Sequence, residues 1–164
     1  MTKQKPIEII TPPNTLKAKV GGAIPALDQK AIARAEAALE QMSGQFADWI
    51  KEELAHLLDA WAKYEAAHGS AAARGELHRR AHDLKGLAPT YGYPLVGRIC
   101  ASLCKLTGDE HASINPPEKL LKAHVDATKA AVLGKIMGAD HPVGIALAVE
   151  LETHVKTLIA SNNG

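Results

Sequence analysis

The sequence is poor in aromatic side chains and in net charge. Phenylalanine, tyrosine and tryptophan make up 4% of its 164 residues, although 46% of the residues are hydrophobic. Sheets draw heavily on aromatic and β-branched residues, so this composition, rich in alanine, favours closely packed helices. Lysine and arginine number 19 against 18 acidic residues, a formal net charge of +1. This balance argues against a nucleic-acid binder and against a polybasic membrane anchor.

Long apolar runs are also missing, and cysteine is scarce. No run approaches the ~20 residues that a membrane-spanning helix needs, and the N-terminus MTKQKPIEII lacks the apolar region of a secretory signal. We therefore expect a cytoplasmic protein that does not contact a membrane. The two cysteines, Cys100 and Cys104, have the spacing of neighbours on one helix face rather than of a CxxC redox or zinc pair. We expect both to be reduced core thiols.

Apolar residues recur at helical spacing from Asp28 onward. The pattern predicts a helix from Asp28 to Met42, a break at Ser43-Gly44, and a second helix whose apolar stripe places Trp49 and Trp61 in the core. The predicted helices after the break cover about residues 45–67, 71–91, 94–106, 116–137 and 142–159. Asn115 is the expected cap of the fifth helix of the six.

The domain organisation follows from this pattern. Residues 1–25 hold four of the nine prolines and show no sustained helical period, so we expect an irregular N-terminal arm. Residues 26–164 are then one helical domain. Short connections make consecutive helices antiparallel, and we expect an all-α, up-and-down bundle of four long helices with additional shorter helices.

The third predicted helix, over about residues 71–91, carries the residues best suited to chemistry. His82 shares one helix face with four neighbours, His78, Arg79, Lys85 and Gly86. Glycine inside a helix costs about 1 kcal/mol relative to alanine, and here the missing side chain leaves room for a second macromolecule to reach the imidazole. The cation of Lys85 favours a neutral, nucleophilic imidazole and would stabilise phosphoryl oxygens. The stripe therefore predicts transient phosphoryl capture at His82.

This segment resembles the histidine-containing phosphotransfer (HPt) domains of bacterial multistep phosphorelays, whose signature is His-x-x-Lys-Gly with a further glycine in the turn region. His82, Lys85 and Gly86 match that core, and Gly92 stands at the tenth position after the histidine. The resemblance implies a four-helix bundle in which His82 is the phosphoacceptor at Nε2, Lys85 stabilises the phosphoryl group and Gly86 gives access. It also implies that the chain needs no metal or other cofactor, because Mg²⁺ belongs to the receiver domain.

The same resemblance implies the partners. His82 would accept a phosphoryl group from an aspartyl phosphate on a receiver domain and pass it to another receiver, in response regulators and hybrid histidine kinases. Nothing in the chain looks like a kinase nucleotide-binding domain, so we expect a monomeric carrier, a freestanding relay module rather than an enzyme.

Residues beside the motif complete the expected binding face: His78, Arg79, Pro89 and Gly92. Pro89 departs from the pattern, because it removes the hydrogen bond to the Lys85 carbonyl and should kink or end the helix.

Three alternatives stay open at this stage. His78 and His82 could bind a divalent metal as an i,i+4 pair, although no carboxylate or cysteine completes a set and catalytic zinc needs three protein ligands. The bundle could instead be a scaffold that binds a kinase without accepting phosphate. It could also be a degenerate histidine-kinase dimerisation domain, which would self-associate.

Overall fold

The computed structural model describes residues 29–109 and 114–162, so the expected irregular arm over residues 1–25 lies outside the described residues. The chain divides into two compact units, residues 1–40 and 41–164. Of the first unit the structure describes residues 29–40, which are the first turns of helix α2 (Gln29–Ala66). In these turns the apolar side chain of Ile32 is exposed.

Helix α2 continues through Ser43 and Gly44, so the predicted break there is wrong. A glycine costs a helix only about 1 kcal/mol, which a helix of 38 residues tolerates. A Cβ added at Gly44 would meet nothing within 4 Å, so no packing contact requires a glycine at this point. The two helices predicted over residues 28–42 and about 45–67 therefore form one continuous helix.

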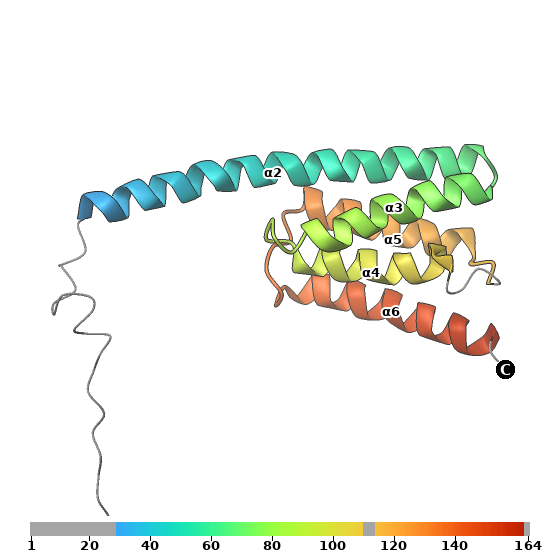
Figure 1. Ribbon diagram of the computed structural model, residues 1–164. Coiled ribbons are helices and arrows are strands. Elements are labelled where there is room, and N and C mark those ends of the chain that lie inside the picture. The colour runs from blue at the N-terminus through green and yellow to red at the C-terminus, as the bar shows by residue number, and fades with distance from the viewer. Residues whose placement is uncertain (1–28, 110–113, 163–164) are drawn as a thin grey trace, which may run out of the picture. The chain divides into compact units, whose positions relative to one another are not determined.

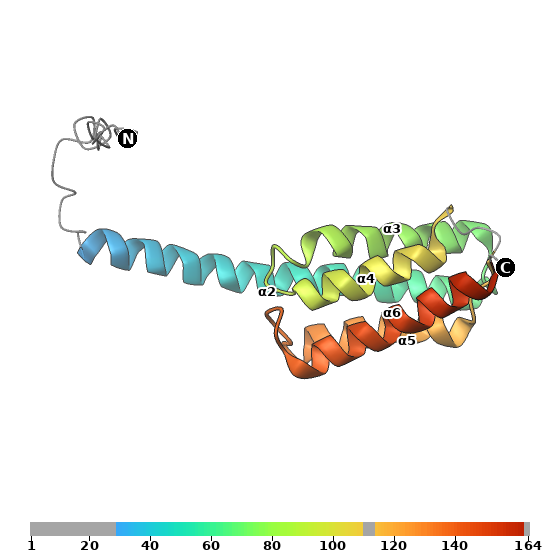
Figure 2. The ribbon, with the colours of Figure 1, turned by 90° about the horizontal axis from the view of Figure 1, so that it is seen from below.

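Four further helices follow in the second unit: α3 (Ala71–Leu87), α4 (Pro94–Thr107), α5 (Glu118–Leu133) and α6 (Pro142–Asn162). With the second half of α2 they run alternately up and down (Figure 1), and the described residues are all helical apart from their connections. Helix α4 lies in the middle, where it packs against α3, α5 and α6 (Figure 2). The predicted all-α class is confirmed.

The ends of α5 differ from those predicted. The helix begins at Glu118 after Pro117, without a side-chain cap, so Asn115 is not the cap. It ends at Leu133 rather than near Met137. The reason for the early end is the backbone of Lys135, which has a φ of 51°, in the left-handed region that no α-helix adopts.

The core is built from one face of each helix. Its largest fully buried side chains are Ile50, Leu57, Leu77, Leu84, Leu95, Ile99, Leu103, Leu106, Leu121 and His124. Trp61 is 6% exposed, as predicted, whereas Trp49 is 44% exposed, so its predicted core position is wrong. Trp49 lies against two other rings instead, those of Phe46 (centroids 5.7 Å apart) and Tyr91 (6.0 Å).

A fifth helix, α6, follows α2, α3, α4 and α5. At 21 residues it is longer than each of the three helices that precede it. Its Ala148 and Leu151 pack with Ile99 of α4 and Ala127 of α5 in a small second cluster. Val143, in the first turn of α6, is exposed.

None of the helices in the described part is long and apolar enough to cross a membrane.

Candidate functional site

His82 is on the exposed side of α3. The opposite face, formed by Leu77, Ala81 and Leu84 at helical spacing, is completely buried. The first turn of the helix is capped by Ser70, whose side chain accepts a hydrogen bond from the Ala73 N–H at 3.4 Å. His82 is therefore open to solvent while the helix that carries it is fixed to the core.

The side chain of His82 borders a hollow of about 380 Å³ between α3 and α4. Three of the predicted site residues meet there: His78, His82 and Lys85. The rest of the lining comes from α4 and the residues directly after it: Ala101, Cys104, Lys105, Gly108 and Asp109. The predicted chemistry thus has a defined cleft beside the histidine.

The charge around this hollow is positive. Lys85 from α3 and Lys105 from α4 are both exposed, and within the described ranges neither lies within ion-pair distance of a carboxylate. Asp109 is the one acidic residue among the lining residues. Two unneutralised ammonium groups next to an imidazole suit an incoming phosphoryl group, whose oxygens each accept charge-assisted hydrogen bonds.

His78 is half-buried and anchored to α4. Its Nδ1 lies 3.0 Å from the Thr107 hydroxyl oxygen, and its ring centroid is 6.3 Å from that of His82. In the described part of the chain, no three side chains of histidine, cysteine, aspartate or glutamate are grouped as a metal site would need. The hydrogen bond to Thr107 also occupies one of the two His78 nitrogens.

Gly86 is exposed, and a Cβ built on it would meet nothing within 4 Å. No packing contact inside the protein therefore requires a glycine at this position, although it costs the helix about 1 kcal/mol relative to alanine. The open surface over Gly86 lies one helical turn after His82.

Pro89 acts as the sequence predicted, by ending the helix. Helix α3 stops at Leu87, short of the expected end near residue 91. Ala88 still has a helical backbone, and the proline after it has no N–H with which to continue the helical hydrogen bonds. The proline ring packs against Gly97 of α4: a Cβ at Gly97 would lie 2.9 Å from Pro89 Cγ and 3.3 Å from the Lys85 carbonyl oxygen. The carbonyl that lacks a donor from Pro89 thus faces the backbone of α4.

Gly92 lies in the turn after α3 and not at the His82 hollow. Its φ is 87°, a left-handed conformation that glycine adopts without strain. It borders another hollow, of about 390 Å³, together with Phe46, Tyr91 and Met137. The structure therefore gives this motif glycine a conformational reason.

Arg79 is exposed on α3 and forms an ion pair with Glu76, which also binds Arg80 Nε at 2.9 Å. Part of the positive charge of this helix is therefore neutralised within it. Arg74 is used elsewhere: its guanidinium donates to the Leu106 carbonyl at 2.7 Å, near the C-terminal end of α4.

Both cysteines are free, as predicted, but only Cys100 is in the core. Cys104 is half-buried and lines the hollow. Burial raises the pKa of the Cys104 thiol to about 11, despite the opposing effect of Lys85, and raises that of Cys100 to about 12. Neither cysteine is a thiolate at neutral pH, so neither competes with His82 as a nucleophile.

Sequence reasoning missed the contribution of α4 to this site. Lys105, Thr107 and Gly108 line the hollow or anchor His78, yet the predicted fourth helix marked only its apolar face and its stop signal. The sequence alone does not show which neighbouring helix a lysine on an exposed helix face lies against. Only the packing of α4 against α3 brings Lys105 to the histidine.

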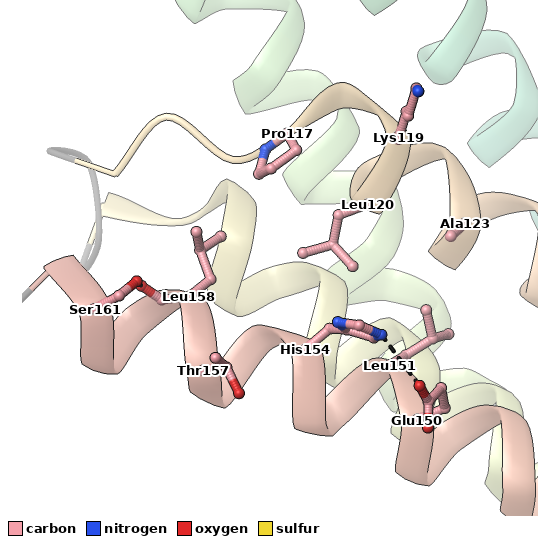
Figure 3. A pocket seen from close by; sticks show the side chains of 10 residues that line it. All are labelled: Pro117, Lys119, Leu120, Ala123, Glu150, Leu151, His154, Thr157, Leu158 and Ser161. Atoms are coloured by element: carbon pink, nitrogen blue, oxygen red, sulfur yellow. Dashed lines mark hydrogen bonds and ion pairs between the residues drawn. The ribbon is translucent and has the colours of Figure 1, made fainter.

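A larger hollow, of about 570 Å³, lies between α5 and α6 (Figure 3). Leu120, Leu151 and Leu158 line it, and His154 on its edge binds Glu150 with 3.1 Å between Nε2 and Oε1. Its lining is mainly apolar and its histidine is paired with a carboxylate, so it does not offer the cationic surroundings found at His82.

The family model for the Hpt domain matches residues 41–131, more than half of the chain, from the middle of α2 to the last turn of α5. No curated protein matches. No solved structure matches either. The Hpt domain is a histidine phosphotransfer module of phosphorelays, a carrier rather than a kinase, and it interacts with receiver domains. This chain belongs to the Hpt domain family.

Proposed function

We propose that His82 accepts a phosphoryl group from the aspartyl phosphate of one receiver domain and passes it to the aspartate of another. The observation that carries this proposal is the exposed imidazole on the rigid helix α3, bordering a hollow with two cations that no carboxylate neutralises in the described residues. Phosphoryl transfer asks the protein for little beyond this positioning and charge compensation.

The transfer step involves one bond formed and one broken. A lone pair on the unprotonated nitrogen of His82 attacks phosphorus, and the bond between phosphorus and the aspartyl oxygen breaks with its electron pair on the leaving carboxylate. The leaving group needs no proton, so no general acid is required. Mg²⁺ belongs to the receiver in this scheme, and the present chain needs no cofactor of its own.

The neighbours of His82 have separate tasks. Lys85 and Lys105 approach the transferred phosphoryl group from two helices and offset its negative charge. Gly86 leaves the surface open for the receiver, which must bring its aspartate to the imidazole. His78, Arg79 and Pro89 lie on α3 or directly after it, where an approaching receiver would contact them.

The test is phosphoryl transfer from a phosphorylated receiver domain in the presence of Mg²⁺, followed by intact mass and by the acid lability of the bound group. We expect one acid-labile phosphoryl group on the wild-type chain and none on His82→Gln. His154→Gln, an exposed histidine on α6, is the matched control and should be labelled like the wild type. Label retained by His82→Gln would contradict the assignment.

The carrier should act as a monomer that binds one receiver at a time. Sedimentation of the full chain alone and with an equimolar receiver measures this directly. A stable dimer of the free chain would favour the alternative of a histidine-kinase dimerisation domain.

A further inference from the structure

A chain of hydrogen bonds connects His78 to the backbone of α4. The Thr107 hydroxyl lies 3.0 Å from the Leu103 carbonyl oxygen, and a carbonyl only accepts, so the single hydroxyl hydrogen is donated there. The same hydroxyl oxygen lies 3.0 Å from His78 Nδ1. Because its hydrogen is already used, the hydroxyl accepts from His78, and the Nδ1 of His78 therefore carries a hydrogen.

This arrangement determines the state of the other nitrogen. In a neutral imidazole with hydrogen on Nδ1, Nε2 has a lone pair and accepts. Within the described residues, Nε2 of His78 has no hydrogen-bond partner, and the ring borders the same hollow as His82. Nε2 of His78 is thus a hydrogen-bond acceptor one helical turn before His82.

The position of the His78 ring is also fixed. A Cβ added at Gly108 would lie 3.0 Å from His78 Cε1, a tight contact, so the glycine leaves room for the ring against the backbone. Thr107, which holds Nδ1, is buried. The ring therefore has a hydrogen bond on one edge and a close backbone contact beside it.

The distance between the imidazole rings of His78 and His82 fits one water molecule between them. A direct N–H···N hydrogen bond of about 3 Å brings imidazole centroids within about 5 Å of each other. The centroids of His78 and His82 are 6.3 Å apart, which fits a single bridging water.

We propose that His78 is a positioning residue that accepts, through Nε2 and one water, a hydrogen bond from the nitrogen of His82 that faces it. The donors then all run in one direction, from His82 through water, His78 and Thr107 to the Leu103 carbonyl. The outward nitrogen of His82 is left unprotonated, as the nucleophile must be. This inference rests on the proposed function of His82.

The other charged and titratable groups at the hollow do not replace this acceptor. Lys85 on α3 and Lys105 on α4 are cations that only donate, and the Cys104 thiol is a weak acceptor. Asp109, after α4, is the one alternative acceptor among the lining residues. Asp109→Ala, which removes this acceptor, tests it independently and should leave the tautomer of His82 unchanged.

The first measurement is the ¹⁵N NMR tautomer of His82 in the unphosphorylated full chain, which does not depend on any transfer. We expect one tautomer in the wild type and in Thr107→Ser. His78→Leu and Thr107→Val should show both tautomers, because each breaks the chain of donors. His78→Gln, which offers an amide oxygen, should restore the single tautomer.

The second measurement is the rate of phosphoryl acceptance from a phosphorylated receiver. Loss of one hydrogen bond should slow His78→Leu about fivefold, with most of the rate recovered in His78→Gln. A mixture of tautomers in the wild type, or an unchanged tautomer and rate in His78→Leu, would overturn the inference. Should His78→Leu fail to fold, the Thr107→Ser and Thr107→Val pair gives the same decision.

The two proposals fail in different ways. A wild-type chain with a single His82 tautomer but no phosphoryl acceptance would refute the relay function and leave the hydrogen-bond chain intact. Phosphoryl acceptance at His82, with a His82 tautomer that does not change when His78 or Thr107 is substituted, would refute the hydrogen-bond chain and leave the relay function intact.

Discussion

The ring of Pro89 rests directly on the backbone of Gly97. A Cβ at Gly97 would lie 2.9 Å from Cγ and 3.1 Å from Cδ of the proline ring, closer than side chains approach one another. The proline ring is rigid, and the third atom near such a Cβ, the Lys85 carbonyl oxygen at 3.3 Å, belongs to the backbone. This contact joins the turn that ends α3 to the first turns of α4, close to the site.

Gly97→Ala should therefore destabilise the protein by about 1–3 kcal/mol, because the added methyl group forces a well-packed contact apart. Gly86→Ala is the matched control, since it adds the same methyl group to open space in a helix and should stabilise the protein by up to about 1 kcal/mol. Urea unfolding followed by circular dichroism measures both. Equal effects of the two substitutions would show that the Pro89 contact is not tight.

Stability should also fall with acid because of His124. Its ring is completely buried, with Nδ1 donating to the Leu120 carbonyl at 2.7 Å and Nε2 lying 3.0 Å from the Ser102 hydroxyl oxygen. Burial lowers the pKa of His124 in the folded protein. The unfolded chain therefore binds a proton at about pH 6.5 that the folded chain resists, and stability is lost as the pH falls below that value.

The measurement for His124 is the free energy of unfolding between pH 8 and pH 5. His124→Gln should be less stable than the wild type at pH 8, but its stability should decline less toward pH 5. Parallel declines in the two proteins would show that His124 is not the group responsible.

The helical pattern could be read from the sequence wherever a buried stripe was continuous, as on α3, where Leu77, Ala81 and Leu84 are all completely buried. The wrong predictions of helix ends came from short sequence signals of one or two residues. Ser43-Gly44 has the composition of a break but costs a long helix little, and Asn115 has the composition of a cap although the helix begins later, at Glu118. Propensity at one or two residues was outweighed by the helix around them.

The two tryptophans give a direct check of one such error. Trp49 and Trp61 occupy the same predicted stripe, yet they are 44% and 6% exposed. In Trp61→Phe, the remaining Trp49 should emit at longer wavelength and be quenched readily by iodide. In Trp49→Phe, the buried Trp61 should emit at shorter wavelength and be protected. Similar quenching of the two single-tryptophan variants would contradict the exposure of Trp49.

The site was predictable only in the part that lies on one helix. The spacing of His78, His82 and Lys85 along α3 placed them on one face, and they line one hollow. Lys105 and Thr107 could not be found in this way, because their relation to His82 depends on how α4 packs on α3 and not on a spacing along the chain.

The contribution of Lys105 can be tested by comparison with Lys85. Lys85→Met and Lys105→Met should each slow phosphoryl acceptance about three- to tenfold, because each removes an exposed cation from the phosphoryl group, and raising the salt concentration should shrink the difference from the wild type. Lys119→Met, an exposed lysine that lines the hollow between α5 and α6, is the matched control. A normal rate in Lys105→Met would show that Lys105 does not act on the phosphoryl group.

A substitution at Gly86 distinguishes the access of the receiver to His82 from the stability of the protein. A Cβ at this position is free of contacts, so Gly86→Gln should fold at least as stably as the wild type, since glutamine is a better helix former than glycine. Its longer side chain would nevertheless occupy the surface one turn from His82, and we expect phosphoryl transfer from a receiver domain to be strongly reduced. Phosphoramidate, a small phosphodonor that needs no docking surface, should still label His82 in this variant. Reduced labelling from both donors would place the defect at the imidazole itself, and an undiminished rate from the receiver would show that Gly86 is not needed for access.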